Sequence, residues 1–204
     1  MTIKVGITGG IGAGKTTVSQ VFEALGVPVY YADDRAKAIL SQNTDLKSEL
    51  LHHFGSEIFD EQGRPDRKKL AAVVFNDAKK LRILNSLIHP RVGEDWKNWI
   101  ASREYDFLYI MKEAALLFET GSYKKLDYII CVSAPDKLRI KRVSLRDSVG
   151  IEEVKLRMRN QLSQELKISL SDFLIVNDEK RALVPQVIRV HQKLVNLSKR
   201  KKNE

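Results

Sequence analysis

Five short apolar runs lie along the chain, and segments with helical spacing separate most of them. The runs are residues 3–8, 27–30, 107–111, 128–132 and 173–176, and each has the length of a buried strand. After the first run, apolar residues recur at the spacing of a helix; they are Val18, Val21, Phe22 and Leu25. Strands that alternate with helices predict a parallel sheet covered by helices on both faces.

The spacing of these runs is uneven. Only a few residues join the first predicted helix to the run at 27–30, but about seventy residues follow before 107–111, too many for one crossover. The interval carries helical patterns of its own, such as Leu46, Leu50, Leu51 and Phe54. We expect this interval to form a helical insertion over the carboxyl ends of the strands, where open parallel sheets bind ligands.

Composition indicates a soluble globular protein. The chain has 204 residues, of which 43% are hydrophobic and 30% are charged, and this suits one domain or one domain with an insertion. No apolar run approaches the roughly 20 residues of a membrane span, and the first strand begins too early to leave room for a signal peptide. The one cysteine, Cys131, lies in an apolar run and is expected to be a buried core thiol. We therefore expect a cytoplasmic protein with no membrane partner.

The formal net charge of +9 raises the question of nucleic-acid binding. Six lysine and arginine residues lie from Arg189 onward against Glu204 alone, so this terminal segment accounts for five of the nine charges. Such a run is usually a solvated tail. Trp96 and Trp99 share a helix face with Ile100, and core packing is favoured there over base stacking. Because no zinc-finger, basic-zipper or ribonucleoprotein pattern is present, we expect no nucleic-acid partner.

Residues 9–16 read Gly-Gly-Ile-Gly-Ala-Gly-Lys-Thr and fill every fixed position of the phosphate-loop pattern G-x-x-x-x-G-K-[ST]. A predicted strand precedes this loop and a predicted helix follows it. The loop N–H groups and the helix N-terminus therefore converge on one place and can hold a polyphosphate. Lys15 can reach the β- and γ-phosphates, and the Thr16 hydroxyl can bind Mg²⁺. The sequence predicts a nucleoside triphosphate site.

Acidic residues follow the second and third predicted strands. Asp33 follows the run at 27–30 by a few residues, at the same edge of the sheet as the phosphate loop. Its carboxylate can accept a proton from an attacking hydroxyl, hold a metal, or cap a helix that starts near Arg35, and position alone leaves these interpretations open. Glu113 is placed to act on a metal through water, and Glu119 is placed to cap a helix or to form an ion pair in the interior.

Arg139, Arg142 and Arg146 follow the fourth predicted strand at spacings of three and four, so they share one helix face. Such a stripe is often only solvated surface. Because this one follows a strand at the ligand-binding edge, we favour a lid that closes over phosphates.

The four histidines show neither zinc spacing nor the partners of a catalytic triad. One of them, His89, precedes Pro90, and this predicts a helix boundary at His89.

Together these motifs resemble the dephospho-coenzyme A kinase family, over residues 6 to about 187. The phosphate loop is followed, in the order of the family, by Tyr31-Ala32-Asp33, Gly63-Arg64-Pro65-Asp66-Arg67, His89-Pro90-Arg91-Val92, Leu116-Leu117-Phe118-Glu119, Arg142 with Arg146, Gln161, and Asp172-Phe173 with Asn177. The resemblance implies a P-loop NTPase-type α/β fold with a five-stranded parallel sheet flanked by helices. It implies a nucleotide-binding core at 1–33, 105–136 and 167–204, a helical substrate domain at 34–104 and a helical lid at 137–166.

The resemblance also implies the reaction, which is ATP-dependent phosphorylation of the ribose 3′-hydroxyl of dephospho-coenzyme A with Mg²⁺ as cofactor, the last step of coenzyme A biosynthesis. The implied catalytic residues are Asp33 as general base, Lys15 and Arg142. The implied ATP-binding residues are Gly10, Ile11, Gly12, Ala13, Gly14, Lys15, Thr16, Thr17, Arg142, Arg146 and Asn177. Asp33, Arg67 and His89 are implied for the acceptor, and Thr16 for the metal.

Two positions depart from the family pattern. Tyr31 stands where the family has the first of two aspartates, so a metal role at that position is absent. Ala115 replaces a proline before Leu-Leu-Phe-Glu and removes no functional group.

Two alternative functions remain. The first is another small-molecule kinase, such as a nucleoside monophosphate kinase. The second belongs to a different class and is a nucleic-acid-binding ATPase that uses the basic tail. The oligomeric state is not predicted.

Overall fold

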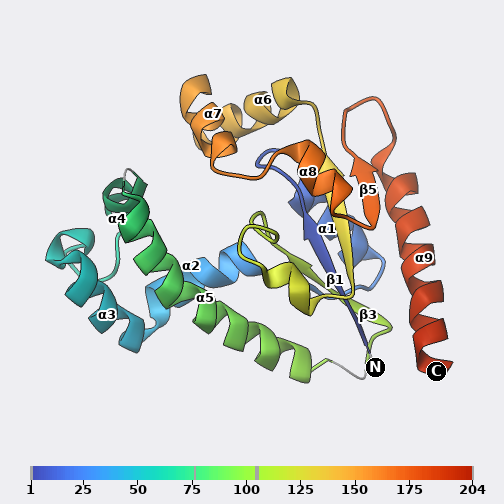
Figure 1. Cartoon of the computed structure of the whole chain (residues 1–204), viewed down its shortest axis with the longest axis horizontal. Helices are drawn as coiled ribbons and strands as arrows, with labels where there is room; N and C mark the ends of the chain where they lie inside the picture. Colours follow the sequence, from blue (N-terminus) through green and yellow to red (C-terminus); the bar gives the residue numbers. More distant parts are fainter. Residues whose placement is uncertain (1, 76, 104–105, 204) are drawn as a thin grey trace. The chain divides into compact units, whose positions relative to one another are not determined.

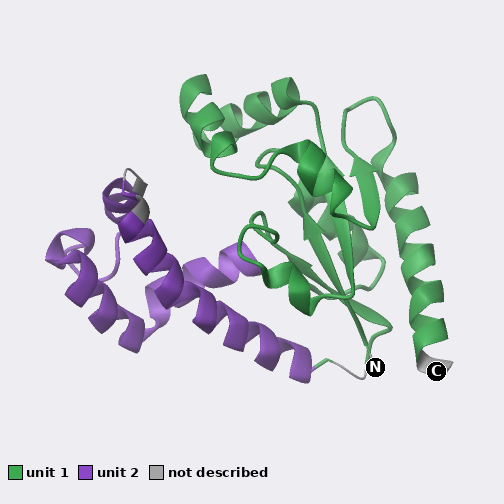
Figure 2. Ribbon diagram, in the orientation of Figure 1, with its two compact units in different colours: residues 1–31, 103–204 green, residues 32–102 purple. Residues whose placement is uncertain are grey.

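The computed structural model describes residues 2–75, 77–103 and 106–203 (Figure 1). The chain divides into two compact units (Figure 2). The first comprises residues 1–31 and 103–204, and the second comprises residues 32–102. Each unit has its own hydrophobic core.

A five-stranded parallel sheet in the order β2-β3-β1-β4-β5 forms the centre of the first unit (Figure 1). The strands are β1 (Ile3–Thr8), β2 (Val29–Tyr31), β3 (Tyr109–Glu113), β4 (Tyr128–Ser133) and β5 (Phe173–Val176). The predicted five-stranded parallel sheet is therefore confirmed. Because β1 lies between β3 and β4, the loop that follows it starts at the middle of the carboxyl edge, where the strand order reverses and ligands bind.

Two strands, β2 and β3, are shifted at both ends from the apolar runs that predicted them. The second strand begins at Val29 because Pro28 has no N–H for the ladder, although its carbonyl accepts a hydrogen bond from the N–H of Met111. The third strand extends to Glu113 and includes Lys112, and both charged side chains are buried. Hydropathy could not indicate this strand end, because its last two residues carry charges. Glu113 is therefore the last residue of β3 and does not follow the strand.

Helices α1 (Lys15–Ala24) and α9 (Leu183–Asn203) pack on one face of the sheet. Phe22 of α1 and Leu194 of α9 belong to the same core as Ile3, Val5 and Ile7 of β1. Residues 114–126, including the short helix η2 (Ser122–Lys125), cover the other face. A Cβ at Gly6 would come within 2.8 Å of the side chains of Leu117, Leu126 and Ile129 on that face.

Three more helices belong to the first unit, α6 (Asp136–Asp147), α7 (Ile151–Arg159) and α8 (Gln164–Ser169).

The basic C-terminal segment continues α9 as far as Asn203. Nζ of Lys201 lies 2.6 Å from Oδ1 of Asp127, and Ser198 is buried. The basic side chains that the structure describes in this segment are exposed, as predicted, but they lie on a helix that packs through Leu194 and Ser198 and do not form a separate tail.

The second unit contains α2 (Ala32–Gln42), α3 (Thr44–Phe54), the short helix η1 (Ser56–Ile58), α4 (Arg67–Phe75) and α5 (Ala78–Ala101). Side chains cap two of them: Asn43 accepts from the N–H of Leu46, and Asp77 accepts from the N–H groups of the first turn of α5. Leu46, Leu50, Phe54, Ile58, Leu70 and Leu84 form its core.

The long helix α5 passes through Pro90 without a break. The prediction of a helix boundary at His89 is wrong. Residues on both sides of the proline are buried, Leu84 before it and Trp96 and Ile100 after it. This packing outweighs the roughly 3 kcal/mol that an interior proline costs a helix. Trp96 is 4% exposed and its ring stacks on Trp99 at 5.4 Å, which supports the core-packing interpretation. No helix in the described part of the chain is both long and apolar enough to span a bilayer.

We predict that Lys112 makes stability increase with pH. Burial, together with the charge of Lys125, lowers the pKa of the Lys112 ammonium from 10.5 to about 8. Between these values the unfolded chain keeps a proton that the folded chain releases, so the free energy of unfolding rises with pH across this window. Denaturant unfolding from pH 7 to 10.5 should show a smaller rise for Lys112→Met than for the unchanged protein. Lys141→Met, at an exposed position of α6, is the control. Equal slopes for all three proteins would contradict the prediction.

Candidate nucleotide-binding site

The phosphate loop occupies the turn between β1 and α1. Gly9, Gly12 and Gly14 have φ values of 151°, 77° and 91°, which L residues with a side chain rarely adopt. Helix α1 begins directly after Gly14, with no side-chain cap and no acidic residue in its first turn. The first N–H groups of this helix have no intrahelical acceptor, and no carboxylate of that turn reduces the positive end of its dipole. This is the arrangement of an anion site.

The first turn of α1 carries the two side chains that were predicted to act on the phosphates and on the metal ion. Lys15 is 9% exposed, and its Nζ donates to the carbonyl of Gly9 at 3.2 Å. The ammonium is therefore folded back toward the beginning of the loop. The Thr16 side chain is exposed, so its hydroxyl is accessible to a metal ion that accompanies the nucleotide.

Three side chains from distant parts of the first unit hold the carbonyl groups of the loop. Arg139 Nε donates to the carbonyl of Ile11 at 3.0 Å, and a terminal nitrogen of Arg142 donates to Gly12 at 3.3 Å. Asn177 Nδ2 donates to Ala13 at 2.9 Å. Three successive carbonyls are thus bound from outside, and this leaves the N–H groups of the loop to form the concave side that binds anions. We call Arg139, Arg142 and Asn177 the carbonyl clamp.

The carbonyl clamp also explains glycines that the phosphate-loop pattern does not require. A Cβ at Gly10 would lie 2.1 Å from a terminal nitrogen of Arg139, and one at Gly12 would lie 2.5 Å from the Arg139 carbonyl. At Gly14, an invariant position of the pattern, a Cβ would lie 2.1 Å from Nδ2 of Asn177. Close approach of the clamp, as well as backbone conformation, therefore requires glycine in this loop.

The arginine stripe of α6 does not act as one surface. Arg139 is 5% exposed and also pairs with Asp136 at 2.9 Å, so the expectation that all three arginines share an exposed lid face fails for this residue. Arg142 is partly exposed, and it pairs with Glu179 at 2.9 Å. Arg146 forms two hydrogen bonds to Asp147, which raise the pKa of the guanidinium and lower the pKa of the carboxyl group. The start of α6 is bound to the phosphate loop, and only its later arginines remain as lid candidates.

The predicted acceptor residues all lie in the second unit. Asp33 is exposed and lies in the first turn of α2, which begins at Ala32. The helix starts three residues earlier than expected, so the interpretation of Asp33 as its N-cap is wrong. Arg67 is the first residue of α4, and His89 lies within α5; both side chains are exposed.

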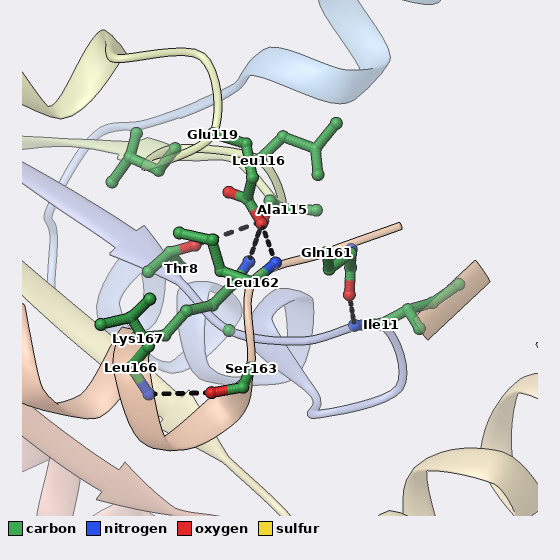
Figure 3. Close-up of polar contacts among 12 residues, drawn as sticks. Thr8, Ile11, Ala115, Leu116, Glu119, Gln161, Leu162, Ser163, Leu166 and Lys167 are labelled. Atoms are coloured by element: carbon green, nitrogen blue, oxygen red, sulfur yellow. Dashed lines mark hydrogen bonds and ion pairs between the residues drawn. The ribbon is translucent and has the colours of Figure 1, made fainter. Parts of the chain in front are cut away.

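The two glutamates beside β3 have different environments. Glu113 is buried and lies opposite Ile7 of β1 in the sheet register. Glu119 forms an ion pair with the buried Lys167 at 2.8 Å (Figure 3). Of the two interpretations of Glu119, the ion pair is confirmed, but only its lysine partner is fully buried, since 18% of the Glu119 side chain is exposed. Within the described residues no three side chains of His, Cys, Asp or Glu gather in a way that could hold a metal ion.

Comparison with known proteins decides the family. The profile of the dephospho-CoA kinase family matches residues 3–182. The chain belongs to the dephospho-CoA kinase family. A dephospho-CoA kinase of Bacteroides fragilis is 36% identical over the whole length of both chains, and one of Porphyromonas gingivalis is 38% identical over 92% of each. The family resemblance inferred from the sequence is confirmed, and so is the prediction of a kinase that phosphorylates dephospho-CoA with ATP.

Solved structures agree with this membership. The protein TT1252 of Thermus thermophilus superposes with a TM-score of 0.84 and 29% identity, over 94% of this chain and 97% of the other. A dephospho-CoA kinase of Campylobacter jejuni gives a TM-score of 0.69 and 28% identity, over 96% and 98%. The predicted P-loop kinase fold is therefore confirmed over nearly the whole chain.

We predict that Gly14→Ala weakens MgATP binding roughly tenfold or more, the equivalent of about 1.4 kcal/mol. The added Cβ would displace Asn177 and release one carbonyl of the loop. Gly26→Ala is a matched control, because Gly26 has a similar φ of 82° but nothing within 4 Å of an added Cβ. Both variants should lose similar stability from backbone strain, and only Gly14→Ala should lose affinity in titration calorimetry. Equal affinities of the two variants would contradict the role of the clamp.

Proposed function

We propose that this chain transfers the γ-phosphoryl group of ATP to the ribose 3′-hydroxyl of dephospho-CoA and releases ADP and coenzyme A, the last step of coenzyme A biosynthesis. The observation that carries the proposal is a phosphate loop with its carbonyls clamped outward, in a chain that belongs to the dephospho-CoA kinase family. Phosphoryl transfer needs alignment and positive charge more than covalent help from the protein, and these residues supply both.

On the donor side, residues 10–17 hold the phosphates through N–H groups other than those of Ile11 and Ala13, which donate to Gln161 and to Gly10. Lys15 stabilises the charge that develops on the transferring group. We assign Arg142 and Arg146 to the lid over ATP. Arg142 donates to the Gly12 carbonyl and pairs with Glu179, so its guanidinium lies beside the loop that binds the phosphates. We assign Asn177 to the adenosine end of ATP, because its side chain is fixed beside Gly14 at the start of α1.

We propose Mg²⁺ as the cofactor, with the Thr16 hydroxyl as its ligand from the protein. The exposed hydroxyl in the first turn of α1 fits this role. Mg²⁺ usually keeps several waters and is held by phosphate oxygens with one or two protein oxygens, so it does not need a cluster of carboxylates. When bound, the ion neutralises charge on the phosphates.

On the acceptor side, Asp33 is the general base. Its carboxylate accepts the proton of the 3′-hydroxyl while the oxygen bonds to the γ-phosphorus and the bond to the oxygen of ADP breaks. Arg67 and His89 bind the acceptor, and both side chains are exposed.

We place the protein in the cytoplasm, with ATP and dephospho-CoA as its partners and no nucleic acid. The one cysteine, Cys131, is a buried free thiol whose pKa burial raises to about 11, as predicted for a core thiol.

A coupled assay of ADP release tests the proposed reaction. ADP release should depend on dephospho-CoA and should stay at the background rate with AMP, CMP or UMP. Turnover of a nucleoside monophosphate and not of dephospho-CoA would replace this proposal with the alternative small-molecule kinase.

We predict that Asp33→Asn lowers kcat by roughly 10²- to 10⁴-fold, the usual contribution of a general base, and leaves the Kd for MgATP unchanged. Asp34→Asn is the control, because Asp34 lies in the same helical turn, is exposed and pairs with Lys37 at 2.5 Å. It should keep kcat within about twofold, as a surface ion pair contributes little. Near-normal turnover of Asp33→Asn would leave Asp33 without a catalytic role.

A further inference from the structure

An ion pair between a buried lysine and a partly exposed glutamate joins two segments that flank the carboxyl edge of the sheet (Figure 3). Lys167 of α8 is fully buried. Its Nζ lies 2.8 Å from the carbonyl of Ala115 and 2.8 Å from Oε1 of Glu119. The lysine therefore holds both the beginning and the end of the turn that follows β3.

The same Glu119 oxygen holds the segment between α7 and α8. It accepts a hydrogen bond from the N–H of Leu162 at 2.9 Å. The hydroxyl of Thr8, the last residue of β1, donates to the Ala115 carbonyl at 3.4 Å. The ion pair thus ties residue 162 to the end of the strand from which the phosphate loop starts.

The residue before Leu162 contacts the phosphate loop itself. Oε1 of Gln161 accepts a hydrogen bond from the N–H of Ile11 at 2.9 Å (Figure 3). The carbonyl of Ile11 is bound by Arg139 of the carbonyl clamp. Both polar groups of this residue are therefore held by side chains, and the peptide planes on either side of Ile11 cannot rotate freely.

An ion pair that buries a lysine is weak support for stability, because the desolvation of Lys167 offsets much of the attraction. A better-attested use of such a pair is to specify one conformation. Here Lys167 and Glu119 have their hydrogen bonds directed at backbone groups as well as at each other. The pair therefore determines where residues 161 and 162 lie more than it adds to the free energy of unfolding.

We propose that Gln161 is a positioning residue of the phosphate loop, and that the Glu119–Lys167 ion pair holds it in place. The loop is then already arranged for phosphates before the nucleotide arrives, which lowers the ordering cost of binding. The proposal rests on the proposed function only in that the ligand of the loop is MgATP. It requires no particular acceptor.

Gln161→Met tests the contact, since methionine fills a similar volume and cannot accept this hydrogen bond well. We expect the Kd for MgATP to rise roughly 3- to 10-fold, the range of one hydrogen bond. Amide hydrogen exchange at Ile11 should become faster, and the Tm should stay close to that of the unchanged protein. Gln164→Met is the matched control, because Gln164 begins α8 three residues later and accepts from the N–H of Ala134 at 3.1 Å. An unchanged Kd for Gln161→Met, or an equal rise for both variants, would overturn the proposal.

The double variant Glu119→Gln with Lys167→Met tests the ion pair and leaves no unpaired buried charge. We expect a similar rise in Kd and in exchange at Ile11, and no further rise when Gln161→Met is added, because both changes break one chain of contacts. Independent effects that multiply would show that the ion pair does not act through Gln161. Binding and exchange are measured without an acceptor, so these outcomes stand whether or not dephospho-CoA is the substrate.

Discussion

The orientation of the peptide groups in the phosphate loop is the constraint on which the rest of this structure depends. A loop of glycines has many accessible backbone conformations, and only those with the N–H groups on the concave side bind phosphate. Arg139, Arg142 and Asn177 remove the others by binding three successive carbonyls from outside, and Gln161 holds the N–H of Ile11. The site is thus preorganised by the protein, and little ordering is left for the nucleotide to induce.

This constraint changes the role that α6, the helix after β4, has in the structure. A helix with arginines on one face looks like a mobile lid, but Arg139 is nearly buried against the loop and Val143 is fully buried. Helix α6 is therefore part of the wall of the nucleotide site as far as Val143. Arg146 is bonded to Asp147, which also accepts a hydrogen bond from Arg157 of α7. Any movement of a lid then concerns the later part of α6 and the residues that follow it.

The errors of sequence interpretation in this chain have a common cause. Charged residues inside β3 concealed the true end of the strand, and the basic end of α9 concealed its continuation as a helix. In both cases hydropathy reports only whether a side chain is polar. Backbone pairing and the burial of neighbouring residues determine where the strand or helix ends. Pro90 led to the opposite error. Its local preference predicted the end of a helix, but packing of the residues on both sides keeps the helix continuous. Glu119 was left between two roles because its partner, Lys167, lies 48 positions further along the chain.

The sequence by itself determined the sheet, the phosphate loop and the family of this protein. Strand, loop and helix are local patterns, so periodicity and the spacing of Gly9, Gly14, Lys15 and Thr16 were sufficient to predict them. The contacts that hold the loop are not local: Gln161 is 150 positions from Ile11 and Asn177 is 164 positions from Ala13. Only the tertiary structure decided that these side chains meet the loop, because the crossovers of a parallel sheet bring together the carboxyl ends of strands that are distant in sequence. The sequence shows where phosphate binds, and the fold decides how the loop is held ready to bind it.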